Sequence, residues 1–334
     1  MSNPNNIYSI SISACATLNM HSLNNEGGEG NQIQTRMVNV IGEDQRMHNV
    51  NAISGDMFKH IQAEHLHRLA VKAGLPLSEG ARTFNANRVN IDIANVGSAI
   101  GAAIQSAGSD SQKLDVILRD CAVTDMEGIL VTASGQSLPR KSVVEFGWVV
   151  GIPDMVESDS YFHVKYAADR SASARSKAAT DEGREANTGQ AIFHRPASSG
   201  VYAIVLNLEL ARVSFNDISQ TYAVDAAARQ QRVRTLLESI LYTFIEPAGA
   251  MRSTQNPHIT NLSGAIVISR DVIPAPCLSA LNSNFTTELQ RVANSLNILR
   301  PNAIEVKPFN SIGGFAETMT QVISAAVPYE LALS

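Results

Sequence analysis

The sequence predicts an α+β fold whose core elements follow one another as strand, helix, strand, strand, helix, strand. Residues 7–19, "IYSISISACATLN", alternate apolar and small polar side chains, as a strand with one apolar face does. Residues 56–73 and 223–244 instead repeat apolar side chains at the spacing of an amphipathic helix. Three short apolar runs are predicted as the remaining strands: 142–151, 201–213 and 263–269.

Length and composition predict a chain with a sizeable hydrophobic core. Its 334 residues exceed the usual size of one domain, and 44% of them are hydrophobic. No apolar run is long enough to cross a bilayer, and the first residues lack the pattern of a signal peptide, so we expect no membrane partner and a cytoplasmic location. Cys15, Cys121 and Cys277 lack metal-ligand or disulfide spacing and are expected to pack in a reducing compartment.

The net charge of −5 argues against a protein that binds nucleic acid non-specifically through a basic surface. It leaves room for local basic strips. A protein that follows one strand of nucleic acid needs only a few cations for each run of phosphates.

We expect one modified domain over 1–334, with insertions at about 74–140 and 157–200. The first insertion should be partly helical, with a helix, a turn at 125–128 and a strand near its end. The second reads as a long hairpin with a polar, mixed-charge tip. Four cations of the tip are candidate phosphate ligands: Arg170, Arg175, Lys177 and Arg184. Neighbouring acidic residues nearly cancel their charge, so an ordinary solvated loop is an equal alternative.

The start of the predicted helix 56–73 has an unusual charge. Ser54, Gly55 and Asp56 are typical of a helix N-terminus, but Lys59 and His60 lie in the opening turn. The free N–H groups and the positive end of the helix dipole disfavour cations there. Two interpretations follow: an ordinary capped helix with a solvent-exposed lysine, or a pocket in which these groups together bind an anion.

Four stretches carry a resemblance to a known family: "ISISACATLNMHSLNNEGGEGNQIQTR", "NAISGDMFKHIQAEHL", "GQAIFHRPASSGVYA" and "GAMRSTQNPH". In this order, from Ile7 to about Phe285, they resemble the DevR-type backbone subunit of type I CRISPR effector (Cascade) complexes, in the RAMP superfamily. The resemblance implies a ferredoxin-like or RNA-recognition-motif palm with a fingers-like subdomain and a thumb hairpin. It also implies a noncatalytic protein without cofactors that polymerises along a guide RNA and presents it to target DNA.

The resemblance also implies site residues and partners. The start of the first helix would contact the sugar-phosphate backbone of the guide, and the Asn-rich loop before it and the loop near 252 would add contacts. The implied RNA-binding residues are Asn24, Asn25, Gln32, Arg36, Ser54, Gly55, Lys59, His60, Arg252 and Ser253. The implied protein partners are further copies of the chain, a large subunit, a guide-handle subunit, a repeat-cleaving endonuclease and a helicase-nuclease recruited for cleavage.

Three other functions compete with this interpretation. His60, Glu64 and His67 have a spacing that could present metal ligands on one helical face, although it is not HExxH, whereas His65 fits the core. Related type III backbone subunits cleave target RNA with a loop aspartate, where this chain offers Glu26 and Glu29. A transcriptional regulator is the third, although no helix-turn-helix with a basic recognition helix is evident.

Overall fold

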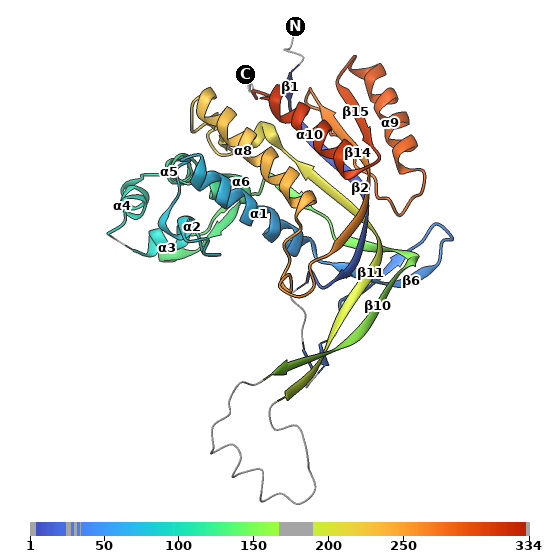
Figure 1. Cartoon of the computed structure of the whole chain (residues 1–334). Helices are drawn as coiled ribbons and strands as arrows, with labels where there is room; N and C mark the ends of the chain where they lie inside the picture. The colour runs from blue at the N-terminus through green and yellow to red at the C-terminus, as the bar shows by residue number, and fades with distance from the viewer. Residues whose placement is uncertain are drawn as a thin grey trace, which may run out of the picture.

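The structure is a computed structural model, and it describes residues 5–24, 28–29, 32–33, 35–95, 97–166 and 190–331. For 28–29, 32–33, 163–166 and 190–193 it describes the main chain alone. Figure 1 shows a central sheet with helices packed on it, and a two-stranded hairpin that projects from the body. The α+β class predicted from the sequence is confirmed.

One large antiparallel sheet forms the centre of the fold (Figure 1). Its main path runs in the order β15, β14, β2, β11, β10, β6, β5. In chain order these strands are β2 (Ser9–His21), β5 (Met37–Ile41), β6 (Met47–Ile53), β10 (Val149–Tyr166), β11 (Gln190–Leu208), β14 (His258–Ser269) and β15 (Ile304–Phe309). Three short strands lie off this path: β4 (Gln32–Ile33) pairs in parallel with β11, β3 (Gly28–Glu29) pairs with β4, and β9 (Val144–Phe146) pairs with β11.

Strand β2 lies between β14 and β11 and is buried on both faces over its first half. The apolar face contributes Ile10, Ile12, Ala14, Ala16 and Leu18 to the main core. Ser11 and Ser13 point to the other face, which the loop after β14 covers. The Leu278 amide donates to the Ser13 hydroxyl at 3.0 Å, and the Ser11 hydroxyl donates to the Pro276 carbonyl. The serines can be buried because their hydroxyls are hydrogen-bonded.

Helices cover both faces of the sheet. The main-core helices are α1 (Gly55–Lys72), α8 (Ala226–Ile245) and α10 (Ile312–Ala325). Helix α9 (Phe285–Leu299) packs on the opposite face near β15, since Ala265 and Val267 join its cluster while Ile266 and Ile268 join the main core. As predicted, His65 on α1 is a core residue: it is buried, and its Nε2 lies 3.0 Å from the Glu246 carbonyl oxygen.

An insertion with its own small core separates α1 from β9. It contains α2 (Glu79–Arg82), α3 (Val89–Ala94), α4 (Ala99–Ser106), α5 (Asp110–Asp120), α6 (Ala122–Glu127), β7 (Ile129–Val131) and β8 (Leu138–Arg140). The turn predicted at 125–128 is wrong, because α6 continues to Glu127 and Gly128, with a φ of 70°, ends it. Asp125 lies inside this helix because Arg140 and Arg232, distant in the sequence, pair with its carboxylate.

The strand predicted over 142–151 is broken into β9 and β10 at Gly147 and Trp148. Both parts pair with β11, and a side chain at Gly147 would place its Cβ 2.4 Å from a Val205 methyl group. Beyond a register shift after Gly151, β10 and β11 pair continuously to Tyr166 and Gln190 as the expected long hairpin (Figure 1).

The remaining short elements lie outside the main sheet. They are β1 (Asn6–Ile7), β12 (Phe215–Asn216), β13 (Thr221–Tyr222), β16 (Val327–Pro328) and the 3₁₀ turns Ala133–Gly135 and Leu210–Arg212. Helix α10 begins at Ile312 because Ser311 caps it: the Gly314 amide donates to the Ser311 hydroxyl at 3.0 Å. Within the described ranges, no helix combines the length and apolarity needed to span a bilayer.

Candidate nucleic-acid interface

Segments that are far apart in the sequence meet where β10 and β11 leave the body (Figure 1). The side chain of Asn24 joins two of them: its Oδ1 accepts a hydrogen bond from the Ser54 amide at 3.0 Å, and its Nδ2 donates to the Ala52 carbonyl at 2.7 Å. The Ala250 amide donates to the Leu23 carbonyl at 3.0 Å and brings in a third segment. Asn24 is buried, and its side chain links these segments beneath the surface.

The loop between α8 and β14 rests on the stem of the hairpin. The Gln255 side chain donates to the Pro196 carbonyl at 2.8 Å, which fixes the loop beside β11. Arg252 and Ser253 are exposed at its turn. Among the described residues, Arg252 has one distant ionic contact, 3.8 Å from Glu246, so its guanidinium is available to a phosphate. The RNA contact that the resemblance implies for these two residues stays a prediction.

Arg36 makes a contact that the sequence did not suggest. Its guanidinium carbon lies 5.7 Å from the centre of the Trp148 ring, and Trp148 is 47% exposed. The Ala52 amide donates to the Arg36 carbonyl at 3.0 Å, so this segment is tied to β6. Exposed aromatic rings and guanidinium planes are the groups on which RNA bases stack. The available signal was that Trp148 is the single tryptophan of the chain, directly after Gly147.

Ser54 and Gly55 have structural roles at the start of α1. The Met57 amide donates to the Ser54 hydroxyl at 3.2 Å, so Ser54 is an ordinary N-cap and is 8% exposed. A Cβ at Gly55 would lie 2.8 Å from the Phe146 carbonyl oxygen and 3.0 Å from that of Gly147. The missing side chain is thus required for packing against the break between β9 and β10.

Gly55→Ala is expected to destabilise the protein by about 1–3 kcal/mol, because main-chain atoms occupy the space of the new methyl group. Urea unfolding measures this change. The matched control is Gly313→Ala in the first turn of α10, where the nearest atom lies 3.9 Å from the position that the new methyl group would take. That variant should be neutral or more stable by up to about 1 kcal/mol. Equal effects of the two substitutions would contradict the packing role of Gly55.

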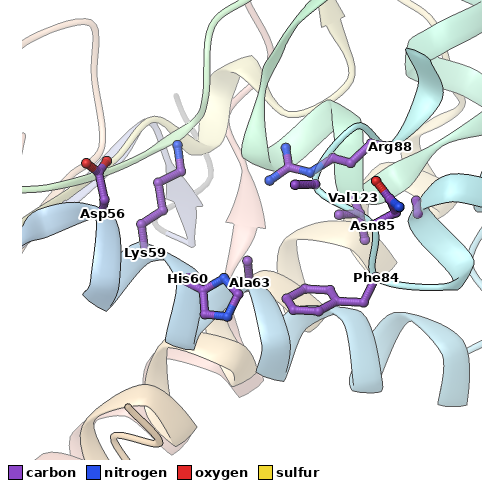
Figure 2. A pocket seen from close by; sticks show the side chains of 10 residues that line it. Asp56, Lys59, His60, Ala63, Phe84, Asn85, Arg88 and Val123 are labelled. Carbon is purple, nitrogen blue, oxygen red and sulfur yellow. The ribbon is translucent and has the colours of Figure 1, made fainter. Parts of the chain in front are cut away.

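Lys59 and His60 line a cavity of about 240 Å³ between α1 and the insertion (Figure 2). From α1 and from the insertion, the polar and aromatic lining residues are Asp56, Lys59, His60, Phe84, Asn85 and Arg88. Burial lowers the pKa of the Lys59 ammonium, while the Glu127 carboxylate acts in the opposite direction. Lys59 is thus not simply exposed to solvent on a capped helix.

The three residues considered as metal ligands make contacts with other groups, and the rings of His60 and His67 both lie near that of Phe84, at 5.4 Å and 5.1 Å. Glu64 pairs with Arg68 one turn along α1. The Nε2 atom of His67 lies 2.9 Å from the Arg82 carbonyl oxygen, and His60 belongs to the cavity. No group of three metal-binding side chains occurs in the part of the chain that the structure describes.

Aromatic side chains mark the stem of the hairpin. The rings of Phe162 and His194 lie 4.3 Å apart, and Phe162 is 71% exposed. The main chain of Gln32 pairs with that of His194, so β4 lies beside this stem. The positions predicted at the tip, Arg170, Arg175, Lys177 and Arg184, lie outside the described residues, as does Asn25.

The family model described as "CRISPR-associated negative auto-regulator DevR/Csa2" matches residues 12–290, which is most of the chain. The chain belongs to the DevR/Csa2 family. The resemblance drawn from four short stretches is confirmed, and every described site residue lies within the DevR/Csa2 match.

Two relatives and one solved structure are similar to this DevR/Csa2 chain. "CRISPR-associated protein Cas7/Cst2/DevR" of Methanocaldococcus jannaschii is 24% identical over 79% of the chain and 82% of the relative. "CRISPR-associated protein Cas7/Csa2 1" of Saccharolobus solfataricus is 26% identical over 72% of each. A chain of a solved "CRISPR RNA-guided surveillance complex, pre-nicking" shares the fold, with a TM-score of 0.52 and 14% identity over 95% of this chain and 100% of the other.

Proposed function

We propose that this DevR/Csa2 protein is a multicopy subunit of a Cascade-like complex in antiviral defence. It binds a guide RNA (crRNA) along the sugar-phosphate backbone, forms a helical filament and presents the guide for pairing with target DNA. The observation that carries the proposal is the convergence of the segments around Asn24, Arg36, Ser54 and Arg252 beside the hairpin. The relatives, which are named as Cas7 proteins, support the same system.

We further propose that the core is a ferredoxin-like, RNA-recognition-motif palm. The chain order β2, α1, β10, β11, α8, β14 and the sheet order β14, β2, β11, β10 support this assignment. In it, the insertion from α2 to β8 is the fingers-like part and the β10–β11 hairpin is the thumb. The exposed ring of Phe162 then suits a thumb that separates stacked bases of the guide.

The interface is better suited to binding the RNA backbone than to catalysing a reaction. It offers separate cations and exposed rings on a chain of net charge −5, which suits contacts with phosphates and stacked bases along one strand. We propose a noncatalytic subunit. If it were instead a nuclease of the type III kind, Glu26→Ala would abolish cleavage and leave RNA binding intact.

The proposed partners follow from this role. They are the guide RNA, target DNA, further copies of the chain, a large subunit, a guide-handle subunit, a repeat-cleaving endonuclease and a recruited helicase-nuclease. The proposal places this assembly in the cytoplasm, as expected from the sequence. A regulatory role would require specific binding of duplex DNA by the protein alone, which a gel-shift assay would detect.

Size-exclusion chromatography with absorbance at two wavelengths tests the proposal, on protein purified with and without a repeat-spacer RNA. We expect RNA and protein to comigrate as a large particle. Arg36→Ala combined with Arg252→Ala should weaken RNA binding about tenfold or more and reduce its salt dependence by about one phosphate contact for each residue.

The control removes two exposed arginines elsewhere, with Arg234→Ala on α8 and Arg291→Ala on α9. This variant should still form the large particle, because its arginines lie away from the interface. A small species free of nucleic acid, unchanged by added RNA, would refute the proposed function.

A further inference from the structure

The loop between α2 and α3 holds two residues in a backbone conformation that side chains disfavour. Phe84 has a φ of 54° and Arg88 a φ of 41°. The Arg88 amide donates to the Asn85 carbonyl at 3.0 Å, and a Cβ at Gly80 would lie only 2.2 Å from the Arg88 carbonyl oxygen. Gly80 therefore permits the close approach that holds the loop. Residues held in such conformations are concentrated at ligand sites. The side chains of Phe84 and Arg88 are therefore candidates for binding a ligand.

Both side chains point into the cavity that Lys59 lines from α1 (Figure 2). The Arg88 Nη1 donates to the Gly128 carbonyl at 2.5 Å, which orients the guanidinium. Lys59 has no hydrogen bond or ion pair with any residue that the structure describes. Asp56 also lines the cavity, so two cations and one carboxylate face the space. The Glu127 and Glu145 carboxylates also act on Lys59 but do not line the cavity, so the attraction for an anion comes from the two lining cations.

A buried carboxylate lies near the two cations. Glu127 is 3% exposed, and the groups that act on its carboxylate are Lys59, Arg88 and the Gln62 side chain. Burial raises the pKa of Glu127, and the nearby charges of Lys59 and Arg88 act against that rise. Since neither cation bonds to Glu127 directly, their N–H groups remain available to a ligand.

The other side of the cavity is aromatic. The rings of His60 and Phe84 lie 5.4 Å apart, and the exposed amide of Asn85 offers a donor and an acceptor beside them. The volume of about 240 Å³ is below the ~300–1,000 Å³ of sites for drug-sized ligands, so one small group fits. Cations beside a stacking ring and an amide match a phosphate joined to a nucleobase.

We propose that this cavity binds one nucleotide of single-stranded RNA, with its phosphate on Lys59 and Arg88 and its base against Phe84 and His60. The inference rests on the proposed function and extends the guide-binding surface from α1 onto the insertion. It assigns RNA contacts to Phe84 and Arg88, which no pattern in the sequence indicated. It also explains the lysine in the first turns of α1, because the ligand is a phosphate that faces the insertion.

Fluorescence anisotropy with a labelled single-stranded RNA, measured over a range of salt concentrations, tests the proposal. Lys59→Gln and Arg88→Gln should each weaken binding about fivefold to tenfold and reduce the salt slope by about one contact. Phe84→Leu should weaken binding with the slope unchanged, because it removes an aromatic ring and no charge. The control is Arg82→Gln, which removes an exposed arginine of the same insertion outside the cavity and should bind as the wild type does.

The outcomes separate this inference from the proposed function. If the wild type binds RNA and Lys59→Gln and Arg88→Gln keep its affinity and slope, the cavity does not bind the strand and the inference is overturned, while the proposed function stands. An equal loss in Arg82→Gln would also overturn it. If the wild type does not bind RNA, both fail. Lys59→Gln breaks no hydrogen bond of the described structure, so it tests the site even if Arg88→Gln does not fold.

Discussion

Replacement of Asp125 by alanine is expected to lower the free energy of unfolding by about 3–5 kcal/mol. The carboxylate is fully buried, and it accepts hydrogen bonds from Arg140 Nη2 and Arg232 Nη1, both at 2.9 Å. The amide and hydroxyl of Ser214 also donate to it, at 3.0 Å and 2.9 Å. Without it, Arg140 keeps only Asp217 as an acidic partner, and Arg232 keeps none in the described structure.

Urea unfolding of Asp125→Ala beside Asp120→Ala measures the difference. Asp120 pairs with Arg119 at the exposed end of α5, and such surface ion pairs contribute about 0–1 kcal/mol. The two substitutions remove the same side chain at positions close in the sequence, and they differ in burial. A loss below about 1 kcal/mol for Asp125→Ala would show that the buried network does not stabilise the fold as we infer.

The same network connects the insertion to the body of the protein. Asp125 lies on α6 and Arg140 on β8, both in the insertion, whereas Arg232 lies on α8. Because α8 packs on α1, this link sets the distance between the insertion and the helix that carries Lys59. Loss of Asp125 should therefore also weaken binding of RNA in the proposed nucleotide cavity, in proportion to the loss of folded protein or more.

The long periodic elements were predictable because their signal is local. The prediction for 56–73 matches α1 to within one residue at each end, and the prediction for 223–244 matches α8 to within three residues. Where the prediction failed, distant contacts decide the structure. Residues 125–128 read as a turn because Asp and Gly are common in turns, but Asp125 stays helical with arginines from other elements.

The candidate site was partly predictable for the same reason. Resemblance pointed to Asn24, Arg36 and Ser54, which the structure does bring together. It gave no sign of Trp148 or Arg88, because their placement depends on a break between two strands and on a loop that Gly80 holds. Both depend on contacts between segments that are distant in the sequence. The spacing of apolar residues along the chain does not predict such contacts.

His21, at the end of β2, should make the stability of the protein depend on pH. Burial lowers the pKa of its imidazole to about 4, from an ordinary value of 6.5. The unfolded chain therefore binds the proton more tightly than the folded protein does. Stability is fully present above about pH 6.5 and falls by about 1.4 kcal/mol per pH unit as the pH drops toward 4, so about 2 kcal/mol is lost at pH 5.

His21→Phe should remove this dependence, because phenylalanine cannot take up the proton. The imidazole is 2% exposed and lies edge-on to Tyr202, with 5.0 Å between ring centres, and neither nitrogen is hydrogen-bonded within the described structure. An apolar ring therefore loses no polar contact at neutral pH. Urea unfolding between pH 4 and 7 measures the effect, with His258→Phe as the control for loss of an exposed imidazole. If His21→Phe loses stability toward pH 4 as steeply as the wild type, the destabilising proton binds elsewhere and His21 does not set this range.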